Sequence, residues 1–434
     1  MVSMSSELQE GIYYRSKPPI GNSFCVISLR AENVTQMGEI GVAAARLWKI
    51  LLKLKKGIVE DLDIDSKHRK GGNLTVLVAY GSELFKIPGS QKDRPANFSD
   101  IWNFKPPASE GGGEILEGAG MTYSTTIFSN HLLRDHLLFQ FIADNEFFTN
   151  RAVVEVWKEL LRLGKNRGSP PLRITGLYTG FQRADHRNWL GFHDGVSNMN
   201  SSERPYVISI NSQNLLPQDN WTLNGTYLAF IRIAINFEKW VYIPTAEQEI
   251  LVGRDKMTGC PLIGVDKNDM PMKDNRCPVP GTSEIIDVGN EYFREHPPYG
   301  IGTKDKILQY SHINRARPID RVPLRDKRSL RIYRQGFEFL EASSEYPGLV
   351  AGLNFVSFQN SPERLFRAMG YRPIASQDGP SSGALPNLDR FMSVLAAGLF
   401  FVPPKVQGEL FPGAQIFFSD RELWNLSKNH EERY

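Results

Sequence analysis

Apolar residues recur along this chain in two patterns, short runs typical of strands and a 3.6-residue spacing typical of helices. In the first half, four runs predict strands at 24–29, 74–80, 137–143 and 174–178. Apolar positions from Ile40 to Leu54, followed by Gly57, predict one helix, and Asp144 or Asn145 is placed to cap a second helix that runs to Leu163. The resulting order, β-α-β-β-α-β, is that of a ferredoxin-like unit.

The second half of the chain repeats this order more loosely. Strands are predicted at 227–235, 329–333, 348–358 and 398–402, with helices around 237–251 and 362–369. We therefore expect an α+β protein of two ferredoxin-like halves with antiparallel sheets, at residues 20–200 and 201–425. An insertion at about 253–327 is longer than an ordinary loop, and loops of that length are usually functional.

Composition and charge narrow the class of protein only slightly. The 434 residues are 41% hydrophobic and 23% charged, as in soluble globular proteins, and a net charge of +3 is too small to favour nucleic acid. The longest apolar run, 392–402, is about half the length that a bilayer requires, so we expect no membrane insertion. The three cysteines, Cys25, Cys260 and Cys277, form no CxxC pair, and their odd number argues against a disulfide framework. Because the polar N-terminus also lacks a signal-peptide pattern, we expect a cytoplasmic protein.

The most distinctive polar segment is GFHDGVSN at 191–198. Two glycines bracket Asp194 and allow the backbone to turn tightly around its carboxylate. Phe181 and Trp189 precede the turn, and burial beside such residues would raise the pKa of Asp194 towards the range in which a carboxyl group transfers protons. The alternative is an aspartate that only caps its own turn, which is the commoner role of such a motif by itself.

His312 and two arginines are the next candidates. No two of the eight histidines have HExxH or HxH spacing, so no zinc site is indicated. His312 lies in the polar and basic segment SHINR. A lone histidine is more often a surface or core residue, but one imidazole is sufficient as the axial ligand of a haem iron. In a strand, Arg331 and Arg334 would point to opposite faces, so one could enter a pocket; both could instead protect an edge strand.

Five segments occur in the order found in dye-decolourising peroxidases, and the chain resembles this family from about residue 24 to residue 404. They are GFHDG at 191–195, QE…VGRDKMTG at 248–259, SHINRARP at 311–318, RIYRQG at 331–336 and GLNFVSFQ at 352–359. The resemblance implies two ferredoxin-like halves packed together, with one haem b per chain held mainly by the C-terminal half. This agrees with the order of elements predicted from the apolar pattern.

The resemblance also implies roles for individual residues. His312 matches the histidine that ligates the iron, Asp194 matches the distal aspartate, and Arg334 matches the distal arginine, with Arg331 as a competitor for the last role. The aspartate would move a proton between the two oxygens of peroxide. The arginine stays charged and donates several hydrogen bonds, so it would stabilise the peroxide anion.

Further residues match the surroundings of the haem. They are Leu353, Phe355 and Phe358 at apolar positions of the pocket wall, and Arg315 and Arg254 as candidates for pairing with the propionates. Asp389 is a candidate for the carboxylate that accepts a hydrogen bond from the second ring nitrogen of the axial histidine. Such a bond would orient the imidazole and raise its basicity.

The implied function is a haem-dependent peroxidase that reduces hydrogen peroxide and oxidises one-electron donors such as dyes and phenolic compounds. The main alternative is a non-catalytic haem-binding or haem-delivery protein of the same fold. A third option is the removal of iron from haem. Neither the physiological donor nor the oligomeric state follows from the sequence, so a homo-oligomer remains open.

Overall fold

The structure is a computed structural model that describes most of both halves of the chain. The described residues are 6–12, 22–60, 62, 70–99, 104, 115–118, 121–124, 131–183, 185, 187–193, 204–212, 215–268, 270–273, 308, 311–313, 332–344, 347–368 and 388–431. Among the predicted site residues, Asp194, Arg315 and Arg331 lie outside this set.

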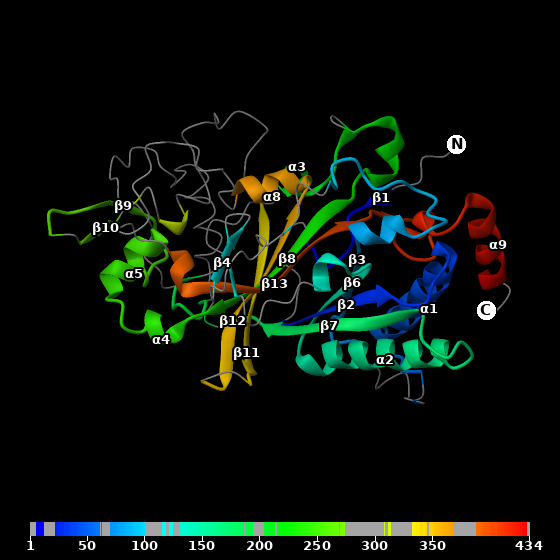
Figure 1. The fold of residues 1–434 in the computed structure, drawn as a ribbon, viewed down its shortest axis with the longest axis horizontal. Helices are drawn as coiled ribbons and strands as arrows, with labels where there is room; N and C mark the ends of the chain where they lie inside the picture. Colours follow the sequence, from blue (N-terminus) through cyan, green and yellow to red (C-terminus); the bar gives the residue numbers. More distant parts are fainter. Residues whose placement is uncertain are drawn as a thin grey trace.

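One ten-stranded sheet runs through the molecule (Figure 1). Its strands are β2 (Ser23–Ala31), β3 (Thr75–Gly81), β4 (Ile115–Gly118), β5 (Met121–Ser124), β6 (Leu137–Ala143), β7 (Leu172–Phe181), β8 (Thr226–Ile235), β11 (Tyr333–Ala342), β12 (Leu349–Gln359) and β13 (Met392–Val402). They lie in the order β3-β6-β2-β7-β11-β12-β8-β13-β5-β4, and β3 also pairs with β13. Among the described strand pairs, β13 with β5 is parallel and the others are antiparallel.

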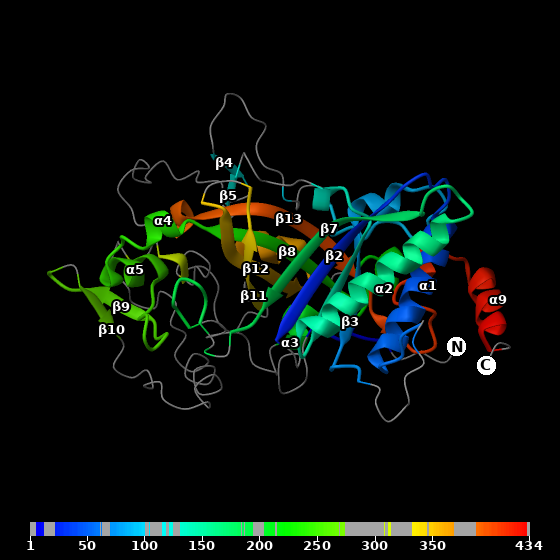
Figure 2. The ribbon, with the colours of Figure 1, turned by 90° about the horizontal axis from the view of Figure 1, so that it is seen from below.

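The N-terminal half has the predicted ferredoxin-like order. Its strands lie side by side as β3-β6-β2-β7, and helices α1 (Met37–Lys55) and α2 (Glu146–Gly164) lie together on one side of them (Figure 2). Of the two candidate caps of the second helix, Asp144 and Asn145, the structure selects Asn145, whose side chain accepts a hydrogen bond of 3.1 Å from the backbone of Phe147. Apolar residues of both helices form one buried cluster with the inner faces of these strands.

The C-terminal half repeats this strand order as β11-β12-β8-β13. Its helices include α4 (Phe237–Trp240) and α5 (Thr245–Val252) after the first strand, and α8 (Pro362–Ala368) before the last. The predicted α+β class with two ferredoxin-like halves is therefore confirmed. Two strand boundaries were wrong: the strand expected at 329–333 begins at Tyr333 and runs to Ala342, and the strand expected at 398–402 begins six residues earlier, at Met392. In Tyr333–Ala342, polar residues interrupt the apolar ones, and Glu338 among them is itself buried, so the apolar run that the prediction relied on is weak.

Shorter elements complete the described fold. They are β1 (Ser6–Glu7) paired with β14 (Lys405–Val406), β9 (Leu262–Val265) paired with β10 (Pro271–Lys273), helices α3 (Arg204–Ile208) and α9 (Asp420–Glu431), and 3-10 helices at Ser82–Lys86, His131–Leu133, Pro217–Thr222, Leu388–Phe391 and Ala414–Ile416. Figure 1 places α9 and the β9–β10 hairpin at opposite ends of the molecule. None of the described helices is long and apolar enough to cross a membrane.

Apolar side chains join the two halves. The rings of Phe24 in the N-terminal half and Phe337 in the C-terminal half stack with 4.2 Å between their centroids. Residues after β13 also return to the N-terminal half, because a Cβ added to Gly41 of α1 would lie 2.6 Å from Phe417 and 2.6 Å from Phe418. This contact requires the glycine, and it packs a segment of the predicted C-terminal half against α1.

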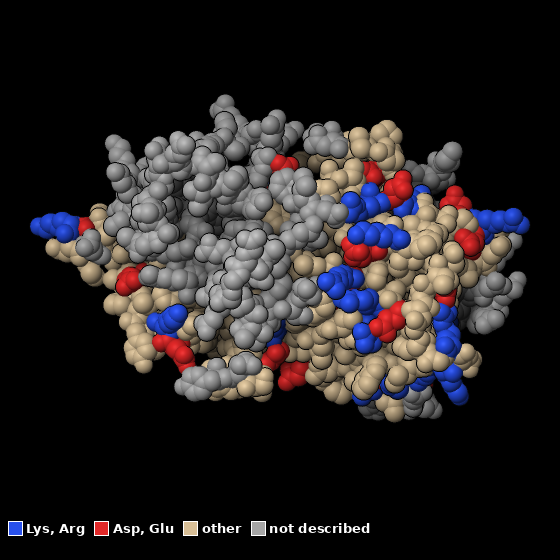
Figure 3. Space-filling view, in the orientation of Figure 1, with Lys and Arg blue, Asp and Glu red and all other residues tan. Residues whose placement is uncertain are grey.

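The described residues show how charged side chains are distributed on the surface and which cysteines are bonded. In Figure 3, basic and acidic side chains are interspersed over the described part of that face. Cys260 is disulfide-bonded, whereas Cys25 is free and buried. The odd number of cysteines argued against a disulfide framework, and it does not exclude this bond. Cysteine usage no longer supports a reducing compartment, and the cytoplasmic location remains a prediction.

Candidate active site

Arg334 and the predicted pocket wall lie on one face of the C-terminal half of the sheet. In the antiparallel pair of β11 and β12, Arg334 is directly opposite Ser357, Gly336 is opposite Phe355, and Glu338 is opposite Leu353. Residues directly opposite each other in such a pair point to the same face, with Cβ atoms about 4.5–5.5 Å apart. The register therefore brings Arg334 close to Ser357 and aligns both with the apolar side chains expected to line a haem pocket.

Phe358 lies on the opposite face of β12. It pairs with Tyr333, and it is fully buried in the cluster between the two halves with Phe337 and Phe230. Phe355, three residues earlier, packs against a different cluster that includes Ile231. Side chains an odd number of positions apart on a strand leave by opposite faces, so Phe358 cannot share a pocket wall with Phe355.

Two polar side chains of β12 on the Arg334 face are buried without complete hydrogen bonding. Ser357 is fully buried, and its Oγ makes no hydrogen bond to any described residue. Gln359, two residues further along the same face, donates from Nε2 to the carbonyl of Tyr227 at 3.1 Å, but its Oε1 accepts nothing from the described part of the chain. Leaving one buried polar atom unsatisfied costs about 1–3 kcal/mol, so such atoms usually meet water or a ligand.

His312 lies on a short turn that packs against the end of α5. Ser311 is fully buried, and its hydroxyl donates to the carbonyl of Leu308 at 2.8 Å. Gly253 ends α5 with φ of +85°, and an added Cβ there would lie 2.5 Å from Ser311 Oγ and 2.7 Å from Ile313 Cγ1. Glycine is thus required twice at this position, for the left-handed backbone and for the close approach. The contact holds both neighbours of His312, which itself is half-buried.

The turn that leads into Asp194 is held by Arg187. Its Nη1 donates to the carbonyls of Gly191 and Lys256, both at 2.7 Å, and its Nη2 donates to His193 Nε2 at 2.9 Å. Because a guanidinium can only donate, His193 accepts through Nε2 and carries its proton on Nδ1. These bonds give His193 a structural partner and fix the backbone just before Asp194.

The same turn and α5 share one apolar cluster. Leu190 and Phe192 of the turn are buried with Leu251 and Val252 of α5, together with residues of the 3-10 helix Leu388–Phe391. The end of α5 therefore contacts the His312 turn on one side and the segment before Asp194 on another. Asp389, the candidate partner of the axial histidine, belongs to that 3-10 helix, and its role remains a prediction.

The segment after α5 is basic and internally bonded. Arg254 is buried, and its Nη1 donates to the carbonyl of Gly259 at 2.7 Å. Burial lowers the pKa of Lys256, an effect that Glu249 opposes and Arg187 reinforces. The Lys256 ammonium lies 5.5 Å from the centre of the Phe192 ring. Arg254 thus has a structural role in its loop, and its pairing with a propionate remains a prediction.

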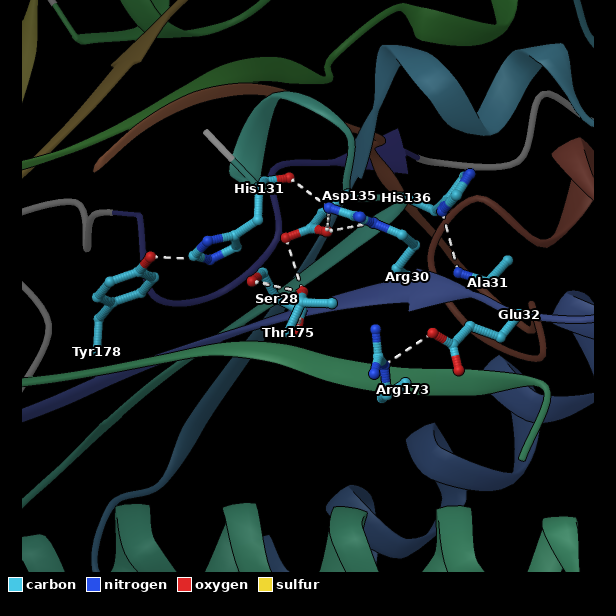
Figure 4. Close-up of polar contacts among 10 residues, drawn as sticks. All are labelled: Ser28, Arg30, Ala31, Glu32, His131, Asp135, His136, Arg173, Thr175 and Tyr178. Carbon is cyan, nitrogen blue, oxygen red and sulfur yellow. Dashed lines mark hydrogen bonds and ion pairs between the residues drawn. The ribbon is translucent and has the colours of Figure 1, made fainter. Parts of the chain in front are cut away.

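A second polar cluster lies in the N-terminal half, around the fully buried carboxylate of Asp135 (Figure 4). Its Oδ1 accepts from Nε and Nη2 of Arg30 at 3.1 and 2.9 Å, and its Oδ2 accepts from Thr175 at 2.8 Å. His131 Nε2 lies 2.9 Å from the hydroxyl of Tyr178. Burial is the main cause that lowers the pKa of His131. The cluster ties a 3-10 helix to β2 and β7.

Sequence reasoning missed three residues of the candidate site. Arg187 gave no signal, because its backbone contacts depend on a loop about seventy residues away. Ser357 and Gln359 did give one, since they are polar positions in the mainly apolar run GLNFVSFQ, although its third polar residue, Asn354, is bonded to Arg232 and Thr179. The side-chain parity of a strand also separates Phe358 from Phe355 on the sequence alone.

Comparison with known proteins identifies the family. The family model described as Dyp-type peroxidase, C-terminal, matches residues 185–407, more than half of the chain. The deferrochelatase of Yersinia pseudotuberculosis is 24% identical over 345 residues, which are 77% of this chain and 64% of that protein. The deferrochelatase of Escherichia coli K12 is 25% identical over 224 residues, or 51% of this chain and 43% of that protein. The chain thus spans less than two thirds of either curated relative.

Solved structures share the fold over nearly the whole chain. Ferric DtpA from Streptomyces lividans superposes with a TM-score of 0.64 at 20% identity, over 96% of this chain and 98% of that one. A DyP-type peroxidase from Cellulomonas bogoriensis gives a TM-score of 0.63 at 19% identity, again over 96% and 98%. The segment from the Arg187 turn through the His312 turn to β13 lies within the matched region, and the chain belongs to the Dyp-type peroxidase family.

Proposed function

We propose that this chain is a haem peroxidase that reduces hydrogen peroxide and oxidises aromatic one-electron donors. Membership of the Dyp-type family implies haem as the cofactor and peroxidase chemistry in general. The observation that carries the specific proposal is the face of β11 and β12, where the cation of Arg334 lies opposite the buried hydroxyl of Ser357 and beside Phe355. A charged donor beside an apolar wall suits a small polar substrate held against a flat apolar cofactor.

The described residues fit a haem. Its iron needs one protein ligand, and His312 offers an imidazole on a turn that the contacts of Gly253 hold in place. Leu353 and Phe355 would contact the porphyrin, and the buried Oγ of Ser357 on the same face makes no hydrogen bond to the described residues. When bound, haem would supply the iron at which peroxide is cleaved and would store the oxidising equivalents.

Arg334 and Asp194 would have different roles towards peroxide. The guanidinium of Arg334 keeps its charge and would donate hydrogen bonds to the peroxide anion and to the oxygen on which negative charge grows. The carboxylate of Asp194 would take the proton from one peroxide oxygen and return it to the other, so that water leaves. The bonds from Arg187 to Gly191 and to the Lys256 backbone would support this role by fixing the approach of the turn.

The names of the curated relatives favour a second candidate. Those proteins are called deferrochelatases, a name for the removal of iron from haem. The same pocket could hold haem for that reaction, since a single imidazole ligand and an apolar wall serve both functions. The two functions differ in their product, which is water and an oxidised donor in one case and iron-free porphyrin in the other.

The test is to load the purified chain with hemin and mix it rapidly with hydrogen peroxide while the Soret absorbance is recorded. We expect a fast absorbance change, and we expect Arg334→Leu and Asp194→Asn to slow it by roughly 10²–10³-fold while the resting Soret band is kept. Arg173→Leu is the matched control, because Arg173 is an exposed arginine of the N-terminal half paired with Glu32.

The outcomes separate the candidates. A hemin-loaded protein whose spectrum does not respond to peroxide would contradict the peroxidase and leave a haem-binding or haem-delivery protein. Fluorescence of iron-free protoporphyrin, measured after incubation with hemin and a reductant, would favour iron removal. An equal loss of rate in Arg173→Leu would show that Arg334 acts only through the charge or stability of the whole molecule.

A further inference from the structure

We propose that Ser357 is a third hydrogen-bonding residue of the peroxide site, where its hydroxyl acts beside the guanidinium of Arg334. The inference rests on the proposed function, because it assigns a partner to a small polar ligand in that pocket. The ligand would be water, hydrogen peroxide or a small anion, each of which can accept a hydrogen bond from a serine hydroxyl.

Register is the first reason. Ser357 pairs directly with Arg334 across β11 and with Ala229 across β8, in a stretch of ladder without bulges. All three side chains therefore leave the same face of the sheet. Because Ala229 is small, Arg334 and Ser357 are the polar groups at this level of the three strands.

The unsatisfied hydroxyl is the second reason. A buried serine on a strand normally bonds a carbonyl or another side chain, as Ser28 does with Thr175 at 3.2 Å. Ser357 is equally buried and has no such bond to the described residues. It can therefore donate to a ligand without giving up a contact within that part of the protein, so the bond is gained in full when the ligand arrives.

The polar strip around Ser357 is the third reason. Gln359 is fully buried on the same face, and its amide is oriented by the bond from Nε2 to Tyr227, which leaves Oε1 as an acceptor without a donor among the described side chains. The surrounding cluster is apolar and includes Tyr227, Ala229 and Phe401. Two unsatisfied polar groups side by side in an apolar cluster favour an ordered polar ligand over a purely structural core.

The role follows from these positions. Arg334 would supply the charge that attracts the ligand, and Ser357 would supply a directional hydrogen bond that fixes which oxygen of peroxide faces the iron. Ser357 is thus a positioning residue for the ligand that Arg334 holds. Its hydroxyl can donate to the anion or accept from neutral peroxide, which suits a site where the protonation of the ligand changes.

The experiment is a titration of hemin-loaded protein with sodium fluoride, because fluoride is a small anion that accepts hydrogen bonds and its binding changes the haem spectrum. We compare Ser357→Ala, which removes the hydroxyl, with Ser357→Thr, which keeps it. Val356→Ala is the matched control, because Val356 is the adjacent residue on the opposite face of β12. We expect Ser357→Ala to weaken fluoride binding roughly tenfold, as for one hydrogen bond to a charged group, and the other two variants to bind within about threefold of the wild type.

A second measurement tests whether Ser357 has only a structural role. The thermal midpoint of the haem-free protein should stay the same or rise in Ser357→Ala, since that hydroxyl has no partner to lose among the described residues. Fluoride affinity that is unchanged in Ser357→Ala would overturn the inference, and so would a lowered midpoint with unchanged affinity. Failure of the wild-type protein to bind hemin would instead contradict the proposed function itself. The Soret band shows whether hemin is bound before any fluoride is added.

Discussion

Two buried polar clusters of this molecule differ in how completely they are satisfied. Around Asp135 in the N-terminal half, both carboxylate oxygens accept hydrogen bonds, from Arg30 and from Thr175. On the face of β12, Ser357 Oγ and Gln359 Oε1 are as deeply buried and have no hydrogen-bond partner within the described ranges. A satisfied cluster already has its function in holding elements together, whereas an unsatisfied polar atom is available to bond water or a ligand. The comparison therefore separates buried polar groups that hold elements together from buried polar groups that are available to a ligand.

The largest expected effect concerns the proposed haem site. Replacing His312 with alanine removes the one imidazole proposed for the iron, and we expect the affinity for hemin to fall by roughly two orders of magnitude. His136→Ala is the control, because His136 accepts a hydrogen bond from Ala31 within the N-terminal half. Titration of each protein with hemin measures the effect, and an equal loss in both variants would argue against ligation by His312.

The next effect concerns the satisfied cluster around Asp135. Asp135→Ala leaves Arg30 and Thr175 without their acceptor, and because Arg30 is partly exposed we expect a loss of about 2–3 kcal/mol in the free energy of unfolding. Glu32→Ala removes an exposed pair with Arg173 and should cost less than about 1 kcal/mol. Chemical denaturation compares the two. Hemin affinity should not change in either, and a change would place the cluster in the haem site.

A matched pair of serines sharpens the comparison directly. Ser28→Ala breaks a bond to Thr175 inside the satisfied cluster, so we expect a cost of about 1 kcal/mol. Ser357→Ala breaks no bond to the described residues of the haem-free protein, so its cost should be near zero. Both are fully buried strand residues, and burial alone predicts equal costs. Denaturation of the two haem-free variants under one condition decides between burial and hydrogen bonding.

The smallest effect is a pH dependence of the N-terminal cluster. Burial is the main cause that holds the pKa of His131 and of His136 below the usual value of 6.5. Below that pH the unfolded chain takes up protons before the folded one, so stability is complete above about pH 6.5 and falls as the pH decreases. We expect the double variant His131→Asn, His136→Asn to lose part of this dependence between about pH 7 and pH 5. A free energy of unfolding that changes equally steeply with pH in both proteins would contradict this prediction.

Much of the fold followed from local patterns. The strand at Leu137–Ala143 and the order of both ferredoxin-like halves were predicted from apolar spacing, because burial of one face imposes a period of two or 3.6 residues. The cap of the second helix was narrowed to Asp144 or Asn145. The strand Tyr333–Ala342 was placed too early, since polar residues interrupt its apolar run. Its identity as a half-buried strand depended on its neighbours in the sheet.

The candidate site divides in the same way. The segments around Asp194, His312 and Arg334 were identified from their residues and from their resemblance to one family, since the type of side chain sets the chemistry it can perform. The tertiary structure alone decided that Arg334 faces Ser357, that Phe358 packs into the cluster between the halves, and that Arg187 clamps the turn before Asp194. Each of these depends on register or contact between segments distant in the chain, which no local pattern encodes.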